Sequence, residues 1–292
     1  TIASETGVRP LDEKNVTFKG RVSPGGIIAV NTKTGEIFSE KQIDDRLKNR
    51  APYRDWLKEN TIYVESSLDK YEGPGLKKID SEQFNVSSKL FLLFKEERTS
   101  VIKPLAIDSQ EGTGSMGDDT ALAVMSKMHR QIYDYFRQQF AQVTNPPIDS
   151  LREASVMSLE TCYGPELNIF DETPEHAKRL VTTSPVLSHK KLQSIIANPY
   201  FKCEEIKLEY KKQINLKIAL ETLQKKVIQS AKNGNTIIHL KESLPNKNLL
   251  PINALLAVGC VHQQLVKLGL RSKVNLVITS SSARDTHQIA CL

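Results

Sequence analysis

The sequence has few cysteines, and their spacing excludes several kinds of metal site. Its four cysteines are scattered and form neither a CxxC nor a CxH pair; they are Cys162, Cys203, Cys260 and Cys291. Zinc and iron–sulfur sites usually draw on such closely spaced ligands. The histidines show no HExxH or other paired spacing either. We therefore expect no metal site in this chain, and the scattered thiols without a recognisable signal peptide predict a cytoplasmic protein without disulfides.

Long apolar runs and blocks of one charge are also missing. No stretch approaches the ~18 consecutive apolar residues that a membrane helix needs, so we expect no membrane partner. The 40 basic and 34 acidic residues give a formal charge of +6. The lysines stand singly or in pairs such as Lys190–Lys191 and Lys225–Lys226, and no aromatic residues are interleaved with a basic patch. We therefore expect no nucleic-acid partner.

The composition is that of an ordinary globular protein, with 39% hydrophobic and 25% charged residues in a chain of 292. That length fits one large domain or two small ones. Ile27–Val30 and Glu36–Phe38 flank a Thr34-Gly35 turn and predict a β-hairpin within a β-like stretch that begins near Val16. Apolar spacing predicts helices from Lys41 to Leu57, interrupted around Pro52, and from Val86 to Phe94.

A polar loop and a long helix are predicted in the middle of the chain. Residues 108–119 are rich in Gly, Ser and Asp, which is typical of a loop. From Ala121 to Gln142, apolar residues recur at spacings of three to five and predict an amphipathic helix. Pro146 and Pro147 would end it, because proline cannot donate a backbone hydrogen bond.

The last third alternates between helical and strand patterns. Helices are predicted at 216–231 and 253–268 and strands at 236–240 and 274–278, with Gly234 and Gly269 at helix ends. Ser280–Ser282 could cap a final helix from about Ala283. The fold class is therefore α/β, with parallel βαβ units in a barrel-related or open sheet, an N-terminal β-hairpin segment and additional helices. Because the final helix still continues at Leu292, we expect the chain to be a fragment.

Three possible chemical sites have simpler structural interpretations. The loop at 112–119 has the glycine content of a phosphate-binding loop but lacks its Lys-Ser/Thr pair, and Asp118 and Asp119 could bind a metal or cap a helix. Ser280–Ser282, Asp285 and His287 could form a triad, but no GxSxG elbow is present. Thr1 could act as an N-terminal nucleophile or could mark a cut end. We favour the structural interpretation of each.

The run from Tyr133 to Asp149, YDYFRQQFAQVTNPPID, resembles the large chain of glutamate synthases. Further matching segments extend along the chain; they are ASETGV at 3–8, PGGIIAV at 24–30, APYRDWL at 51–57, GSMGDDT at 114–120, LREASVMSLET at 151–161, SPVL at 184–187 and SSSARDTHQIA at 280–290. The seventeen-residue run is specific, unlike a single short glycine motif.

The resemblance implies an enzyme that hydrolyses glutamine, channels the ammonia, and makes glutamate from 2-oxoglutarate with FMN, an iron–sulfur cluster and NADPH or ferredoxin. It assigns residues 1–40 to the tail of the amidotransferase domain or a linker, and residues 41–292 to the central domain. The implied partners are the amidotransferase and FMN-binding domains of the same polypeptide and a small reductase subunit. Because the catalytic groups and cofactor sites would lie outside this chain, we expect the isolated chain to hold no cofactor and to be inactive.

Two groups of site residues follow from the resemblance. An ammonia-tunnel or interdomain role is expected for Gln142, Thr144, Asn145, Pro146 and Pro147. An interface role is expected for the loop residues Ser115, Met116, Gly117, Asp118 and Asp119. Two alternatives remain: the 142–147 segment could serve only in domain packing, and the chain could be an independent α/β module that binds a small ligand through GTGSMGDD and SSSARD.

Overall fold

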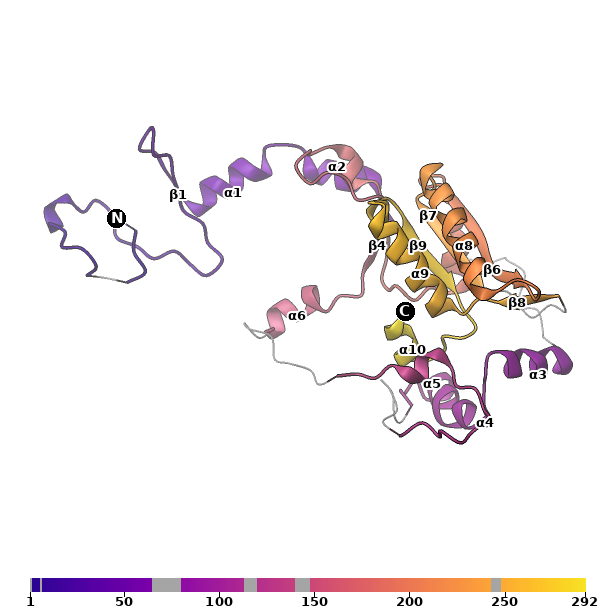
Figure 1. The fold of residues 1–292 in the computed structure, drawn as a ribbon. Coiled ribbons are helices and arrows are strands. Elements are labelled where there is room, and N and C mark those ends of the chain that lie inside the picture. The colour runs from indigo at the N-terminus through magenta and orange to yellow at the C-terminus, as the bar shows by residue number, and fades with distance from the viewer. Residues whose placement is uncertain (1, 6, 65–79, 113–119, 140–147, 243–247) are drawn as a thin grey trace. The chain divides into compact units, whose positions relative to one another are not determined.

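The computed structural model describes residues 2–5, 7–64, 80–112, 120–139, 148–242 and 248–292 (Figure 1). The chain divides into two compact units, Thr1–Glu59 and Asn60–Leu292. Each unit is described by itself.

The first unit contains the predicted hairpin. Strand β1 (Ala29–Val30) pairs antiparallel with β2 (Ile37–Phe38), and the Asn31 side chain accepts hydrogen bonds from the amides of Lys33 and Thr34 in the turn. The prediction of a hairpin is confirmed, but the β-like stretch before it forms no strand, and Glu13–Asn15 is a 3-10 turn, η1.

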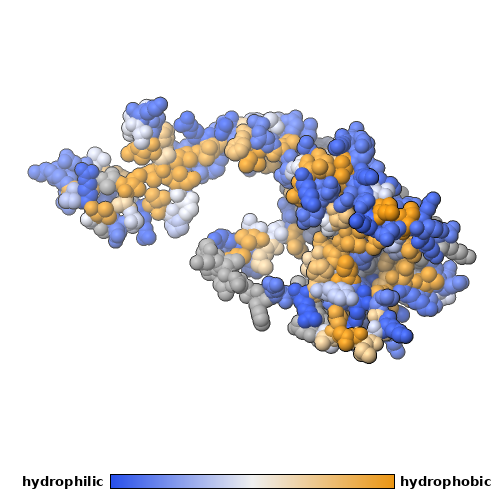
Figure 2. Space-filling view, viewed as in Figure 1, coloured by the Kyte–Doolittle hydropathy of each residue, from blue (hydrophilic) through white to orange (hydrophobic). Residues whose placement is uncertain are grey.

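Two helices follow the hairpin, with Pro52 between them. They are α1 (Glu40–Lys48) and α2 (Tyr53–Asn60), so the predicted interruption is confirmed. Ser39 caps α1, with Gln42 bonding back to the Ser39 amide. None of the unit's described residues is buried, and Figure 2 shows apolar surface, in orange, along the β1–α1 stretch.

The second unit begins with a small sheet that sequence reasoning missed. Its strand order is β3-β5-β4, with β3 (Thr61–Tyr63) parallel and β4 (Thr161–Tyr163) antiparallel to β5 (Arg179–Thr182). A strand of three or four residues is too short to show the alternation of apolar and polar side chains that predicts a strand.

The larger sheet carries the predicted βαβ units. Its strand order is β8-β6-β7-β9, where β6 (Cys203–Lys211), β7 (Ile237–Glu242) and β9 (Asn275–Thr279) are parallel and β8 (Leu249–Pro251) is antiparallel to β6. Helix α8 (Leu216–Lys232) joins β6 to β7, and α9 (Ala254–Lys267) lies between β7 and β9. The predicted α/β class with parallel βαβ units is confirmed.

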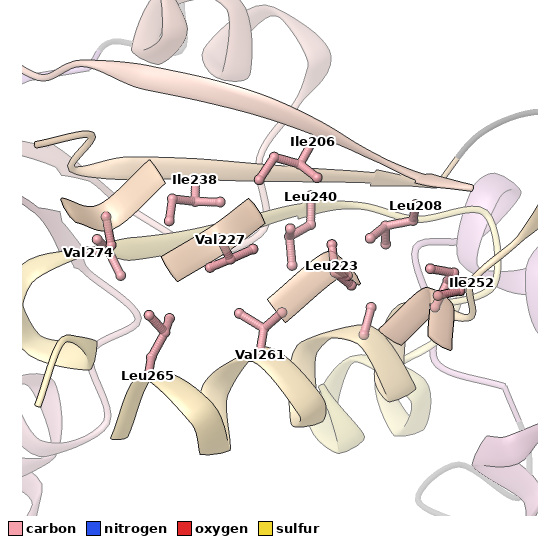
Figure 3. Packing of buried hydrophobic residues seen from close by; sticks show 13 residues of the cluster. Ile206, Leu208, Leu223, Val227, Ile238, Leu240, Ile252, Val261, Leu265 and Val274 are labelled. Atoms are coloured by element: carbon pink, nitrogen blue, oxygen red, sulfur yellow. The ribbon is translucent and has the colours of Figure 1, made fainter. Parts of the chain in front are cut away.

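Both connecting helices pack on the same face of this sheet (Figure 3). Because side chains alternate along a strand, Ile206 and Leu208 of β6 and Ile238 and Leu240 of β7 reach this face. They meet a second set of buried residues from the helices, which are Leu223, Val227, Val261 and Leu265. The strand order advances from β6 to β7 to β9 with helices on one side, which is the arrangement found in part of a barrel.

The opposite face of the sheet is covered at the amino-terminal end of its parallel strands. There Ile237 and Val277 pack against Tyr163 and Leu180 of the small sheet and against Ile195. Ile195 belongs to α7 (His189–Ile196), whose first turn is capped by the Ser188 side chain. The small sheet and α7 therefore form a second hydrophobic cluster against the larger sheet.

Short helical elements precede the larger sheet. They are α3 (Ser81–Leu90), α4 (Lys95–Glu97), the π-helical η3 (Arg98–Ile102) and α5 (Lys103–Ile107). The predicted helix at 86–94 starts earlier, because the Asp80 carboxylate accepts the Gln83 amide and caps the first turn. It ends before Leu92, whose φ of 51° is left-handed.

The predicted long helix at 121–142 is wrong within the described residues. Residues 120–131 form a loop with a turn, Val124 and Met125 are 92% and 93% exposed, and the only helical element is the 3-10 turn η4 (Ile132–Tyr135). This segment makes hydrogen bonds to residues distant in sequence. The side-chain amide of Gln131 donates to the backbone carbonyls of Phe91 and Leu92. Among residues 120–139 only Tyr133 is buried, so packing of an apolar face does not stabilise a helix here.

The remaining elements are α6 (Ser150–Val156), η5 (Pro174–Ala177), η6 (Arg271–Lys273) and α10 (Thr286–Cys291). The final helix was expected from Ala283 with a serine cap; instead it starts at Thr286 and Asp285 caps it through the Gln288 amide. None of the helices in the described ranges is long and apolar enough to span a membrane.

Candidate functional site

The candidate site lies at the carboxyl ends of β7 and β9, the edge where α/β proteins commonly place functional groups. Glu242, the last residue of β7, is buried and its carboxylate accepts five hydrogen bonds. Its Oε2 accepts the Ser280 hydroxyl at 2.8 Å and the amides of Ser281 and Ser282 at 2.7 and 3.0 Å. Its Oε1 accepts the Ser282 hydroxyl at 2.8 Å and the Ala254 amide at 2.9 Å. One carboxylate thus joins β7, the serine loop (Ser280–Ser282) and the first turn of α9.

Arg284 connects this loop to the helical segment near residue 97. Its Nε and Nη2 lie 2.7 and 2.9 Å from the two carboxylate oxygens of Glu97. The side chains are 13% and 15% exposed. Nη1 also donates to the carbonyls of Phe91 and Ser281. This paired geometry is the strongest that a guanidinium and a carboxylate form.

Tyr133 connects the serine loop to η4. Its side chain is fully buried, and its hydroxyl lies 3.5 Å from the Ser282 hydroxyl. Burial is the largest cause that raises the pKa of the Tyr133 phenol, and it outweighs the hydrogen bond to Ser282. The ring Nε2 of His287 lies 3.0 Å from the Tyr133 carbonyl oxygen. The segment 280–287 therefore holds three parts of the chain that are distant in sequence.

These partners decide between the candidate chemistries at 280–287. The hydroxyls of Ser280 and Ser282 are engaged by Glu242, and His287 faces a backbone carbonyl. Asp285 caps α10. A Ser/His/Asp triad requires the histidine to contact a serine hydroxyl, so this geometry does not form one.

A second polar group lies on the sheet face opposite α8 and α9. His239 is buried, with Nε2 2.8 Å from the Thr279 hydroxyl and Nδ1 3.5 Å from Glu205 Oε2. Lys241 also pairs with Glu205 at 3.2 Å. Burial, the largest cause, lowers the pKa of His239; Glu205 raises it and Lys241 lowers it again. The Nδ1 atom has no hydrogen-bond partner among the described residues, so burial favours the neutral imidazole here.

The cysteines do not gather into a cluster that fits an iron–sulfur centre. All four are free, and they lie on β4, β6, α9 and α10. Burial raises the pKa of each thiol, which opposes the thiolate that such ligation needs. Within the described ranges, no three His, Cys, Asp or Glu residues come together to hold a metal ion.

The structure does not describe the predicted tunnel and interface residues. Gln142, Thr144, Asn145, Pro146 and Pro147 fall outside the described residues, as do Ser115, Met116, Gly117, Asp118 and Asp119. Sequence reasoning singled out the 280–287 segment but missed Glu242, Glu97 and Tyr133. An acidic residue at the carboxyl end of a buried parallel strand was the available signal for Glu242.

Two family models match the chain. The model described as "Glutamate synthase central domain" matches residues 87–292, and "Glutamine amidotransferases class-II" matches residues 1–56. The two matches do not overlap and together leave only residues 57–86 unassigned.

Curated relatives match along the chain's length. The ferredoxin-dependent glutamate synthase of Spinacia oleracea is 36% identical over all of this chain and 18% of its own length. The glutamate synthase [NADPH] large chain of Bacillus subtilis is 31% identical over 99% of this chain and 19% of its own length. The glutamate synthase [NADH] of Saccharomyces cerevisiae is 33% identical over 99% of this chain and 14% of its own length. The chain thus spans less than a fifth of each, and it belongs to the glutamate synthase central domain family, next to a class-II amidotransferase segment.

Proposed function

We propose that this chain is the interdomain part of a glutamate synthase large subunit, where it joins the glutamine amidotransferase domain to the FMN-binding synthase domain. One observation carries the proposal: a single chain matches the amidotransferase family at 1–56 and the central domain family at 87–292. The parent reaction would convert glutamine, 2-oxoglutarate and a reductant into two molecules of glutamate.

The parent enzyme's iron–sulfur cluster would bind outside this chain, because the separated cysteines do not fit a cluster site, and the resemblance implies that FMN binds outside it as well. The relatives' names include ferredoxin, NADPH and NADH; the resemblance implies NADPH or ferredoxin as the reductant of the parent enzyme. A small reductase subunit would be a partner in the NADPH case. Cytoplasmic location and the inactivity of the isolated chain stay predictions, as does the boundary at residue 40.

An ammonia-tunnel role is proposed for Gln142, Thr144, Asn145, Pro146 and Pro147. Ammonia must stay neutral and away from bulk water between two reaction centres, which requires a fixed, largely apolar passage. Support comes from the residues before the segment, since η4 is anchored through buried Tyr133 and the His287 contact to its carbonyl. On the other side, Asp149 caps α6 through the amides of Leu151 and Arg152. The approach before the segment is therefore anchored by tertiary contacts, and the approach after it begins a capped helix whose residues are all exposed.

An interface role is proposed for Ser115, Met116, Gly117, Asp118 and Asp119. The chain approaches this loop through Gly112, where an added Cβ would lie 2.9 Å from the Val101 Cα. Such a close approach holds the loop's base against η3. The polar residues of the loop would then contact a neighbouring domain.

The alternative, an independent module for a small ligand, would need free donors in the SSSARD segment. There the hydroxyls of Ser280 and Ser282 and the amides of Ser281 and Ser282 bind Glu242. The Arg284 guanidinium binds Glu97. The segment is occupied by the chain's own groups, which supports a structural role for it.

The test uses the full-length polypeptide and compares glutamine hydrolysed with 2-oxoglutarate converted. A bulky Thr144→Trp or Asn145→Trp substitution should leave glutaminase and ammonia-dependent synthesis largely intact but consume glutamine without matching glutamate. Lys225→Trp on the exposed side of α8 is the control and should keep a one-to-one ratio. If the two tunnel variants also keep that ratio, the segment serves in packing alone.

A further inference from the structure

Two adjacent apolar side chains project from a turn between β4 and η5. Ile169 is 80% exposed and Phe170 is 85% exposed. Single exposed apolar residues are ordinary on protein surfaces. Val124 and Met125 form another adjacent exposed pair, so the order of the turn that carries Ile169 and Phe170, rather than their exposure alone, distinguishes them.

The turn beneath these side chains is held by its own hydrogen bonds. Asn168 Oδ1 accepts the Phe170 amide at 3.2 Å, and Asn168 Nδ2 donates to Asp171 Oδ2 at 2.7 Å. The Asp171 amide donates to the Asn168 carbonyl at 3.0 Å, and His176 Nε2 lies 3.0 Å from the same oxygen. The two apolar side chains are therefore presented by an ordered turn.

Both ends of the turn are also fixed to the second unit. On one side the Gly164 amide donates to the Asn275 side chain and the Glu166 amide to the Ser272 carbonyl. On the other side Ala177 is buried, and its carbonyl accepts the Thr61 hydroxyl at 2.9 Å. Preorganisation lowers the entropy lost on binding, so a fixed apolar pair suits a docking role.

The charged residues nearest the pair in sequence are acidic, and Lys178 and Arg179 lie beyond them. Residues 166–175 contain Glu166, Asp171, Glu172 and Glu175 and no lysine or arginine, within a chain whose formal charge is +6. A hydrogen bond from its own backbone amide is the largest cause that lowers the pKa of Glu175, so this carboxylate is ionised at neutral pH. Interface charges select a partner of opposite sign.

We propose that Ile169 and Phe170 form an interface anchor that inserts into an apolar pocket bordered by lysine or arginine. The pocket would belong to the part of the same polypeptide that lies outside these 292 residues. The chain spans less than a fifth of its relatives, and a linked partner is present at high effective concentration. The inference rests on the proposed placement of the chain in a longer polypeptide but not on the ammonia tunnel.

A photo-cross-linking residue at position 170 tests the proposal in the full-length polypeptide. Phe170→p-benzoylphenylalanine keeps the ring and should cross-link, on irradiation, to a peptide outside residues 1–292 that contains lysine or arginine. The control is Ile218→p-benzoylphenylalanine on α8, where the native side chain is 55% exposed. Mixing 15N-labelled and unlabelled protein separates cross-links within one chain from those between two copies.

Two further variants test the apolar and charged parts separately. Phe170→Ala should speed hydrogen exchange in the cross-linked peptide by about fivefold or more, as loss of an interface anchor does. Glu166→Lys should lower the cross-link yield at position 170, because its charge would then repel the basic border. Cross-links between copies, a yield no greater than at position 218, or a peptide without basic residues would overturn the proposal. None of these measurements requires catalytic turnover. They can therefore contradict the interface anchor even where the coupled glutamine reaction supports the proposed function.

Discussion

Arg284 and Glu97 form a two-point ion pair across 187 positions of sequence, with N–O distances of 2.7 and 2.9 Å. Both side chains are largely buried, so solvent screens the pair less than a surface salt bridge. The pair fastens the α3–α5 segment to the loop before α10. It therefore determines where the chain leaves this segment toward residue 112.

Removing one member of this pair should destabilise the second unit. Arg284→Ala leaves the Glu97 carboxylate mostly buried without its partner, and we expect a loss of about 3 kcal/mol in the free energy of unfolding. Arg284→Lys should recover part of it, because lysine keeps the charge but not the two-point geometry. Urea unfolding followed by circular dichroism measures both. Lys241→Ala, which breaks a pair about 40% exposed, is the control and should cost about 1 kcal/mol or less.

Glu242→Gln should loosen the serine loop while preserving side-chain size. Each carboxylate oxygen of Glu242 now accepts hydrogen bonds from serine hydroxyls or backbone N–H groups. In the variant, the side-chain NH2 group would replace one of these oxygens and would face donors that it cannot accept from. We expect a loss of about 2–3 kcal/mol and faster hydrogen exchange at the amides of Ser281, Ser282 and Ala254. Glu221→Gln, on the exposed side of α8, should change neither. Unchanged exchange at the three amides would show that the carboxylate does not hold the loop.

Two helices and two strands of residues 216–279 were predictable from the sequence, whereas the short strand β8 was missed. Helices α8 and α9 are long enough to show an apolar stripe, and β7 and β9 are short apolar runs between helix ends. The 121–142 prediction failed because apolar spacing alone does not show whether an apolar face will be buried. Tyr133 is buried, whereas Met125 and Met128 are exposed, so little apolar burial is available to stabilise a helix in the described part of this segment.

The candidate site was only partly predictable, since its partners are distant in sequence. The serines at 280–282 suggested a helix cap, a local function. In the structure they bind Glu242 from β7 and Asp285 takes the capping role. Parallel pairing of β7 with β9 brings these residues together; the parallel βαβ unit was predicted, but the contact between Glu242 and the serines was not.

The buried histidine predicts a specific pH dependence of stability. Because burial lowers the folded-state pKa of His239, the unfolded chain takes up its proton first as pH falls below about 6.5. The free energy of unfolding should therefore decrease below that pH, by up to about 1.4 kcal/mol per pH unit from this group. His239→Gln should flatten the decrease between about pH 6.5 and 5, whereas His129→Gln at an exposed site should not. An equal slope in wild type and His239→Gln would contradict the assignment.

Two glycines in the second unit should respond to alanine in opposite directions. Gly164 has a φ of 149°, and an added Cβ would collide with the Arg179 guanidinium and lie 3.1 Å from the Lys178 carbonyl oxygen. Gly164→Ala should therefore lower the free energy of unfolding by about 2–3 kcal/mol through backbone strain and crowding. Gly259 lies within α9, where nothing is within 4 Å of an added Cβ, so Gly259→Ala should raise it by about 0.5–1 kcal/mol because alanine favours helix. Thermal and urea unfolding of the two variants give the sign directly. A neutral Gly164→Ala would mean that the chain between β4 and the Ile169–Phe170 turn can shift without cost, and the ordered presentation of that turn would then be wrong.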